Sequence, residues 1–446
     1  MLNRFLFKKI DNAQLVVFRI FYGLLVSAEC YGAIATGWVR RTLVEPQFTF
    51  SFIGFEWLQP LPGNGMYIYF AIMGTLGVLI TLGYKYRFSA FAFAFMWAGV
   101  YLMQKTSYNN HYYLLMLLAF IMAFFPAGSD ASLDAKLNPK LRSHTMHNWV
   151  RWTIILQLFI VYTYASVAKL YGDWLDFSII ELLMNSKGDY PLIGELLQQK
   201  WVHKIIAFAG IFFDLLIVPA LLWKPTRKIA FGFAIFFHLF NSYVFRIGIF
   251  PYLSLAFIVF FFEPQTIRNI FLRTKKVAVD QVFTVPKNRN VIVGVLGIYF
   301  MIQLVLPLRH HAFKDDVLWT EEGHRLSWRM MLRSRSGTIR YRVVNKETDK
   351  VNFIDLDDYL TKKQRRRVAC YPDFAWQFAQ HLKKEYAKKG EDIQVFVTNE
   401  VKVNNGEYYD FIDPKVDLAS VPWKHFAHND WILPSQSPLD SLKTSN

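Results

Sequence analysis

The sequence predicts a polytopic α-helical membrane bundle of about nine spans, followed by a mixed α+β, strand-rich domain outside the cytoplasm. Three observations lead to this fold class. Of the 446 residues, 53% are hydrophobic and 42 are Phe, far more than one soluble core needs. The apolar residues come in blocks close to the roughly 20 residues that a helix needs to cross the hydrocarbon layer. After residue 307 these blocks give way to the alternating and amphipathic patterns of a soluble domain.

Each apolar block is predicted to be a helical span, so a membrane bundle is expected over residues 1–307 and a soluble domain over residues 308–446. The predicted spans are residues 15–36, 66–83, 88–104, 111–126, 149–170, 205–223, 228–245, 249–263 and 291–307. Several are short for a full crossing. The pair 228–245 and 249–263 is so closely spaced that a re-entrant hairpin is an alternative.

Basic residues fix the predicted orientation, because cytoplasmic loops of membrane proteins carry an excess of Lys and Arg. With the N-terminus inside, the cytoplasmic loops receive Arg4, Lys8, Lys9, Lys85, Arg87, Lys136, Lys140, Arg142, Lys224, Arg227, Lys228, Arg268, Arg273, Lys275 and Lys276. An odd number of spans then places the C-terminal domain outside the cytoplasm. The absence of an Asn-x-Ser/Thr sequon favours a bacterial inner membrane over the endoplasmic reticulum.

The net charge of +16 belongs mainly to the bundle. Residues 308–446 hold 23 Lys and Arg against 20 Asp and Glu, which leaves +13 for residues 1–307. Basic loops between spans account for that charge, so the lipid bilayer is the expected partner and nucleic acid is not.

The C-terminal segment has the periodicities of both strands and a helix. Residues 338–345 alternate like a strand, and 347–349 form the expected turn into a second strand at 351–354. Residues 373–389 have helical spacing, and two further strands are expected at 393–403 and 408–412.

Ionisable residues inside spans are expensive and are therefore the first functional candidates. Lys169 lies near the outer end of the fifth predicted span. A lysine that snorkels to the interface is the simple interpretation. The functional one is a desolvated lysine whose neutral amine acts as a general base.

Two polar clusters are predicted at a similar depth. Asn110 and His111 stand at the mouth of the fourth span, where capping of that helix is an alternative role. His238 and Asn241 are three residues apart in the seventh span and so share a helix face, where an interhelical hydrogen bond is the alternative. The shared depth predicts one pocket that opens outward. No metal-ligand spacing and no phosphate-binding loop is found, so no metal is expected.

Motifs along nearly the whole chain resemble the vitamin K-dependent γ-glutamyl carboxylase family, including the membrane module shared with HTTM-like bacterial proteins. The matching pieces, in order, are Leu61–Pro62, Lys105–His111, Ala165–Trp174, Phe237–Ser242, Ile247–Phe250, Leu306–His310, Ser327–Met331, Ser334–Ser336 and Asp413–Asp417.

The resemblance implies an enzyme that couples epoxidation of reduced vitamin K by O2 to carboxylation of a peptide glutamate by CO2. It implies that Lys169, His111 and His238 are catalytic. It further implies that the quinone, of phylloquinone or menaquinone type, contacts Asn110, His111, Asn241 and His310. Trp319 and Trp328 match segments where a glutamate-containing substrate would be held, and a place in the domain core is their alternative role.

Two departures from the family affect these expectations. Ala168 replaces the first of two adjacent lysines, although Lys169 keeps the catalytic position. The chain is also shorter than the animal enzyme, so the identity of the protein substrate stays open. The alternatives are a membrane enzyme that oxidises quinols without carboxylating peptides, a transporter, and a membrane anchor for the outer domain.

Overall fold

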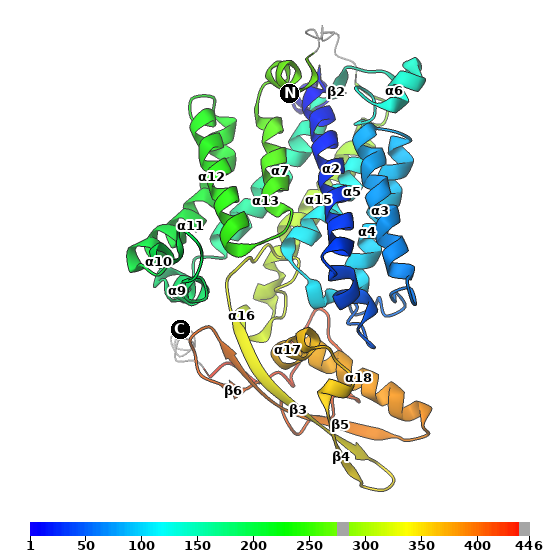
Figure 1. Ribbon diagram of the computed structural model, residues 1–446, viewed down its shortest axis with the longest axis vertical. Coiled ribbons are helices and arrows are strands. Elements are labelled where there is room, and N and C mark those ends of the chain that lie inside the picture. Colours follow the sequence, from blue (N-terminus) through cyan, green and yellow to red (C-terminus); the bar gives the residue numbers. More distant parts are fainter. Residues whose placement is uncertain (274–284, 437–446) are drawn as a thin grey trace. The chain divides into compact units, whose positions relative to one another are not determined.

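The computed structural model describes residues 1–273 and 285–436, so Lys275 and Lys276 of the predicted cytoplasmic loops lie outside the described residues (Figure 1). The chain divides into two compact units. Unit 1 comprises residues 1–44, 51–163 and 212–304, and unit 2 comprises residues 45–50, 164–211 and 305–446. The predicted division into residues 1–307 and 308–446 stays a prediction.

Unit 1 is helical. Its elements are α1 (Leu2–Phe7), β1 (Lys9–Asp11), α2 (Ala13–Ala35), η1 (Arg40–Val44), α3 (Gly65–Leu82), α4 (Tyr86–Met103), η2 (Lys105–Ser107), α5 (Asn110–Phe124), α6 (Leu133–Leu137), η3 (Pro139–Leu141), β2 (Thr145–His147), α12 (Arg227–Phe245), α13 (Phe250–Phe257), η4 (Ile258–Phe261), α14 (Pro264–Ile267) and η5 (Arg268–Leu272). Three helices have residues in both units: α7 (Asn148–Val167), α11 (Lys200–Leu222) and α15 (Arg289–Val305).

Each of the nine predicted spans coincides with helical structure. Within the described residues, six helices are long and apolar enough to cross a membrane: α2, α3, α7, α11, α12, and α15 with its continuation to Ala312. Shorter apolar helices cover Asn110–Phe124 and Phe250–Phe261. The chain is thus a membrane protein, and nine crossings stay a prediction.

Helices α2 and α3 pack closely because glycines lie where they meet. A Cβ added to Gly77 would come within 2.8 Å of the backbone nitrogen of Ser27. A Cβ added to Gly23 would come within 2.5 Å of the backbone nitrogen of Thr81. Small residues that admit a second backbone are typical of helix pairs in membranes, where lipid removes the hydrophobic drive for association.

Buried charges fasten the start of α2 to distant segments of unit 1. The Arg268 guanidinium, 2% exposed, donates to both carboxylate oxygens of Asp11 at 2.6 and 2.8 Å and to Asp130 at 3.3 Å. Arg19, fully buried within α2, donates to the carbonyls of Ala127 and Ala131 at 2.7 Å. The ion pairs of Arg268 are structural, because removing one partner would leave an uncompensated buried ion, and Arg19 is held by backbone carbonyls instead.

Unit 2 contains a four-stranded antiparallel sheet in the order β4-β3-β5-β6 (Figure 1). Its elements are α8 (Gly172–Leu175), α9 (Ser178–Asn185), α10 (Gly194–Leu197), η6 (Leu306–Ala312), α16 (Val317–Thr320), β3 (Arg335–Asn345), β4 (Val351–Ile354), η7 (Leu356–Asp358), α17 (Lys362–Cys370), α18 (Pro372–Lys388), β5 (Ile393–Val403) and β6 (Tyr409–Asp410). Strands β3 and β5 pair along their full length, from Arg335 opposite Val403 to Asn345 opposite Ile393.

The strands and the helix expected in the C-terminal segment are confirmed. The helix α18 buries Phe374, Phe378 and Leu382, which lie on one stripe and pack on the buried face of β3 and β5. The last strand is shorter than expected, because only Tyr409 and Asp410 pair with β5. The helix α17 has a polar sequence that gave no periodic signal, and the capping box of Thr361 and Gln364 fixes where it begins.

Candidate active site

Two histidines of unit 1 lie against one phenylalanine ring. The side chain of Asn109 caps α5 by accepting a hydrogen bond from the Tyr112 N–H at 2.8 Å, which places His111 in the first turn. The His111 ring stacks on Phe250 with 4.0 Å between centroids and 19° between planes. The edge of His238, from α12, faces the same phenylalanine with 6.2 Å between centroids. Unit 1 therefore brings together two of the predicted catalytic residues.

His238 is 2% exposed and has aromatic neighbours. Its Nε2 lies 3.3 Å from the Tyr162 hydroxyl, and the Phe213 ring crosses it at 85° with centroids 5.5 Å apart. Its Nδ1 is buried and has no hydrogen-bond partner among the described residues. When Tyr162 donates to Nε2, Nδ1 carries the proton and can donate it to a ligand oxygen. A buried donor without a partner costs about 1–3 kcal/mol, which a polar ligand atom would offset.

The two predicted amides differ in their surroundings. Asn110 is 7% exposed, and its carbonyl oxygen accepts a hydrogen bond from the Tyr108 hydroxyl at 2.9 Å. Asn241 is partly exposed and follows His238 by three residues in α12. Among the described residues it makes no side-chain hydrogen bond, so a role for it in binding the quinone stays a prediction.

Lys169 belongs to unit 2 and lies two residues beyond the end of α7. It is 6% exposed, and its Nζ donates to the Ala165 carbonyl at 3.0 Å. The ammonium lies over the Trp174 ring, 5.4 Å from its centroid. A Cβ added to Gly210 of α11 would come within 3.0 Å of Trp174 Cζ2, so that glycine leaves room for the ring beside the lysine. The amine is thus buried and held in place, and its role as a general base stays a prediction.

The segment around Lys169 is fastened to α11. The Ser166 hydroxyl donates to the Ile211 carbonyl at 2.9 Å, and Trp174 Nε1 donates to the Ala207 carbonyl at 3.1 Å. These bonds fix both sides of the lysine. A group that must hold its position within a fraction of an ångström needs such support from its neighbours.

The same segment also contacts the C-terminal part of unit 2. The Tyr171 hydroxyl donates to the Leu332 carbonyl, and the Asn404 amide donates to the Asp173 carboxylate at 2.6 Å. These contacts hold the chain around Lys169 against the segment that leads into β3.

Arginines are concentrated in that segment. Arg325 pairs with Asp373, and Arg333 and Arg335 pair with Glu321. Arg325 is bidentate to Asp373, with distances of 2.7 and 3.0 Å. Guanidinium groups bind carboxylates with two parallel hydrogen bonds, so a cluster of arginines suits a carboxylate ligand.

His324 lies within this arginine cluster and is 4% exposed. Burial, reinforced by the charges of Arg333, Arg329 and Arg325, holds the pKa of its imidazole well below its usual range. The ring is therefore neutral at physiological pH, and it adds no further positive charge to the cluster.

Three more predicted residues lie in unit 2. His310, in η6, bonds the Pro307 carbonyl through Nδ1 at 2.7 Å, and Arg329 Nη1 lies 3.5 Å from its Nε2. Trp319 is part of the hydrophobic core and donates to the Leu433 carbonyl at 2.8 Å. Trp328 is 1% exposed. Both tryptophans thus lie where the core interpretation places them, and contact with substrate stays a prediction.

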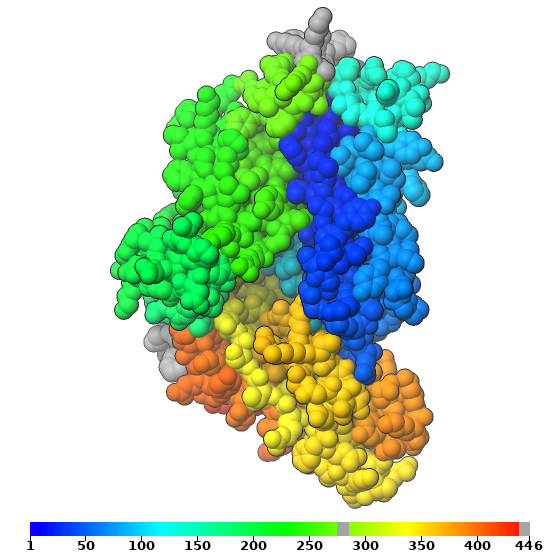
Figure 2. Space-filling model, in the orientation of Figure 1, coloured from blue at the N-terminus to red at the C-terminus, as the bar shows by residue number. Residues whose placement is uncertain are grey.

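An apolar groove of about 750 Å³ runs along unit 1 between α2 and the segments from α12 to η5. Figure 2 shows one face of this region, where α2 (blue) meets α13 (green). The groove is lined by Phe21, Leu24, Leu25, Phe231, Ile235, Tyr252, Leu255, Ala256, Ile258, Val259, Phe262, Thr266, Ile267, Ile270 and Phe271. Tyr252 of this lining lies in α13, the helix that begins with Phe250.

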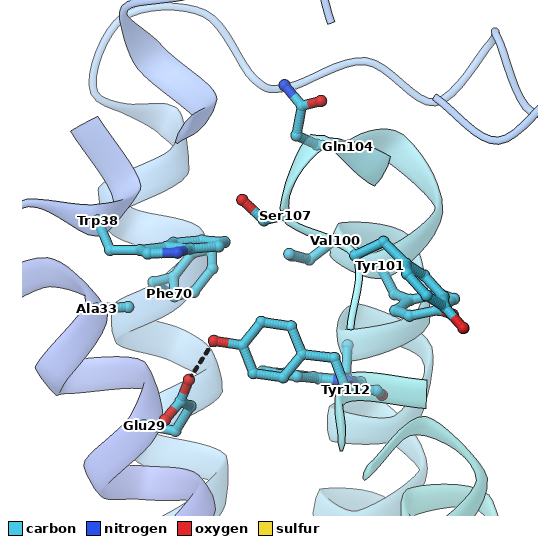
Figure 3. Close-up of a pocket in the computed structure, with 11 residues that line it drawn as sticks. Glu29, Ala33, Trp38, Phe70, Val100, Tyr101, Gln104, Ser107 and Tyr112 are labelled. Carbon is cyan, nitrogen blue, oxygen red and sulfur yellow. Dashed lines mark hydrogen bonds between the residues drawn. The ribbon is translucent and has the colours of Figure 1, made fainter. Parts of the chain in front are cut away.

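Among the charged side chains in spans that the sequence interpretation did not single out, Glu29 lies at a cavity. Glu29 lies in α2, and its carboxylate accepts a hydrogen bond from the Tyr112 hydroxyl at 2.6 Å (Figure 3). An acid inside an apolar helix is itself a signal of function. Glu29 could have been found from the sequence, because an ionisable residue inside the first predicted span is a functional candidate for the same reason as Lys169.

The two units have distinct chemistry. Unit 1 contains the two histidines that contact Phe250, and unit 2 contains the buried lysine and the arginine cluster. Residues 7–265, more than half of the chain, match the HTTM domain. Residues 288–438 match the lumenal domain of vitamin K-dependent gamma-carboxylase. These matches define a membrane-bound protein of the carboxylase class, with an extracytoplasmic domain.

The chain belongs to the vitamin K-dependent γ-glutamyl carboxylase family, and the resemblance found in the sequence is confirmed. No solved structure matches it. Among residues 1–273 and 285–436, no three His, Cys, Asp or Glu side chains are grouped so that they could hold a metal ion.

Proposed function

We propose that this protein is a vitamin K-dependent γ-glutamyl carboxylase that couples epoxidation of the hydroquinone by O2 to carboxylation of a peptide glutamate by CO2. The observation that carries the proposal is the buried, oriented amine of Lys169. The bound hydroquinone supplies the reducing equivalents for O2 and the strong base that removes the γ-proton of glutamate, and CO2 then adds at that carbon.

Lys169 is the proposed first base. In its neutral form, the Nζ lone pair takes a phenolic proton from the hydroquinone. The Ala165 carbonyl and the Trp174 ring hold the amine in one place. Burial keeps bulk water from the proton that is transferred, and it protects the reactive species formed later from being quenched by solvent.

The histidine pair fits an oxygen atom of a quinone. Nδ1 of His238 is a buried polar atom without a partner among the described residues, and a hydroxyl or carbonyl oxygen would satisfy it. The His111 ring stacks on Phe250, and the preceding residue, Asn110, adds a buried amide. Neutral hydrogen-bond donors in a dry site stabilise negative charge on an oxygen far better than water-exposed donors do.

The apolar groove supports a quinone with a long isoprenoid tail. Its volume of about 750 Å³ lies within the range of roughly 300–1,000 Å³ that small-molecule sites occupy. Only Tyr252 and Thr266 bring polar atoms to its lining. A hydrocarbon tail along α13 would leave the quinone ring near Phe250, beside the histidines.

The arginine cluster of unit 2 supports a carboxylate substrate. Arg325, Arg333 and Arg335 lie together beside Glu321 and Asp373, and guanidinium groups bind carboxylates with two parallel hydrogen bonds, which suits the glutamate side chain of a peptide. The contacts of Tyr171 and Asp173 hold the segment of Lys169 against this part of the chain. We further propose that the N-terminus is cytoplasmic and that the protein belongs to a bacterial inner membrane.

The proposal is tested by reconstituting the purified protein with reduced vitamin K, O2, labelled bicarbonate and a glutamate-containing peptide. The expected result is quinone epoxide together with label in the peptide. Epoxide without label would favour an enzyme that oxidises quinols alone. If neither product forms, the proposed function is wrong.

A further inference from the structure

The carboxylate of Glu29 lies at a small cavity in the bundle (Figure 3). The residue is partly buried in α2, six residues before the helix ends, and six residues of helix span about 9 Å. The Tyr112 ring extends from α5 and directs its hydroxyl at the carboxylate, and the Tyr101 hydroxyl points away (Figure 3). The cavity is lined by Glu29, Ala33, Trp38, Phe70, Trp97, Val100, Tyr101, Gln104, Ser107, Tyr108 and Tyr112.

Tyr112 is itself fixed by its neighbours. Trp97 Nε1 donates to the Tyr112 backbone carbonyl at 3.2 Å, and the two rings meet edge to face with centroids 5.2 Å apart. The bond of 2.6 Å from Tyr112 to Glu29 has the length typical of a hydroxyl that donates to an ionised acceptor. The position of the carboxylate is thus well determined.

Within the described part of the chain, Glu29 has no basic partner. A carboxylate in an apolar span is costly unless it meets a cation or takes up a proton. The cavity measures about 20 Å³, and roughly 10–15 Å³ is enough for one water molecule. An organic cation does not fit this space, and a proton is the smallest charge that the site can accept.

The same cavity reaches the histidine site through a tyrosine. Tyr108 lines the cavity, and its hydroxyl donates to the Asn110 carbonyl oxygen at 2.9 Å. Asn110 precedes His111, whose ring stacks on Phe250. One water molecule among Glu29, Ser107 and Tyr108 would complete a line of hydroxyl groups from the histidine site to the carboxylate.

We propose that Glu29 is a second proton acceptor for the hydroquinone bound beside Asn110 and His111, which deepens and rests on the proposed function. One O–H bond of the hydroquinone breaks, and its electron pair stays on the quinone oxygen. The Tyr108 hydroxyl turns from the Asn110 carbonyl oxygen, takes up this proton and passes its own to the water, which passes one on to Glu29. One O–H bond forms on the Glu29 carboxylate. Since Lys169 takes one phenolic proton, this site takes the other.

The matched variants are Glu29→Gln, Tyr112→Phe and Glu56→Gln. Glutamine can still accept the bond from Tyr112 but cannot take up a proton, so the fold is kept while the acceptor is lost. General acid–base groups typically contribute about 10²–10⁴-fold, so we expect Glu29→Gln to lower kcat for epoxide formation about a hundredfold with KM for the hydroquinone unchanged. Glu56 is an exposed carboxylate of the same unit, and its variant controls for the loss of one charge.

A second readout does not depend on turnover. Infrared difference spectra are recorded on adding hydroquinone without O2, in H2O and in D2O. A carboxylic acid C=O band that shifts in D2O is expected in the wild type and in Glu56→Gln, and it should be missing in Glu29→Gln. Tyr112→Phe keeps the acid and should keep a displaced band.

The outcomes separate this inference from the proposed function. A wild-type protein that makes no epoxide would overturn the function whatever Glu29 does. An active wild type with a Glu29→Gln variant of equal kcat, or with an acid band that survives in that variant, would overturn the inference alone.

Discussion

Removing the Phe250 ring should slow epoxide formation with little effect on folding. The Phe250 ring contacts both His111, with 4.0 Å between centroids, and His238, with 6.2 Å between centroids. Stacked aromatic pairs contribute about 0.5–1.5 kcal/mol beyond the area that they bury. If that energy orients His111 in the transition state, Phe250→Ala should lower kcat/KM about two- to thirteenfold, since a tenfold change corresponds to about 1.36 kcal/mol.

The assay measures initial rates of epoxide formation in reconstituted membranes at several hydroquinone concentrations. Phe250→Leu keeps apolar bulk without the ring and should fall between the wild type and Phe250→Ala. The control Phe236→Ala removes a ring of α12 that is 70% exposed, and it should leave the rate unchanged. A Phe250→Ala variant with the wild-type rate would refute the idea that this ring positions the histidines.

Two further predictions follow from the groove and from His324. Ile235→Trp should fill the groove and raise KM at least about fivefold for a hydroquinone with a long isoprenoid tail, because overpacking costs about 1–3 kcal/mol. In the same variant, KM for a hydroquinone with a one-unit tail should not change. The control Ile229→Trp, at a position that is 64% exposed on the same helix, should change neither KM. Equal effects of Ile235→Trp on both hydroquinones would contradict binding of the tail in the groove. Burial holds the pKa of His324 well below 6.5, its value in the unfolded chain. The free energy of unfolding is therefore unaffected by this residue above pH 6.5 and falls as the pH drops below that value. Acid should therefore accelerate hydrogen exchange of unit 2 less in His324→Gln than in the wild type, and equal acceleration would contradict the assignment.

The elements with a clear periodicity were predictable from the sequence. The apolar blocks became helices, and the alternating residues of β3 and β5 became paired strands, because each pattern determines which face is buried. The polar sequence Lys362–Cys370 has no apolar period, and its helix depends on a capping box and on packing against the sheet. Such tertiary support cannot be read from local sequence.

The candidate site was predictable in part. Lys169, His111 and His238 stood out because polar groups in spans are rare, and each is buried or stacked as a site residue would be. Phe250 gave no signal, since an aromatic residue in an apolar block is ordinary until its contacts are known. Two histidines belong to unit 1 and the lysine to unit 2, so their convergence on one cavity stays a prediction.

The central claim is that Lys169 is the base that starts the reaction, and the rate of epoxide formation in Lys169→Ala tests it most directly. The matched control is Lys204→Ala, which removes an exposed lysine of the same unit that also lies over an aromatic ring. We expect Lys169→Ala to lose at least about a hundredfold in epoxide formation, as the removal of a general base does, while binding of the hydroquinone persists. Epoxide formed by Lys169→Ala at the rate of Lys204→Ala would contradict the account.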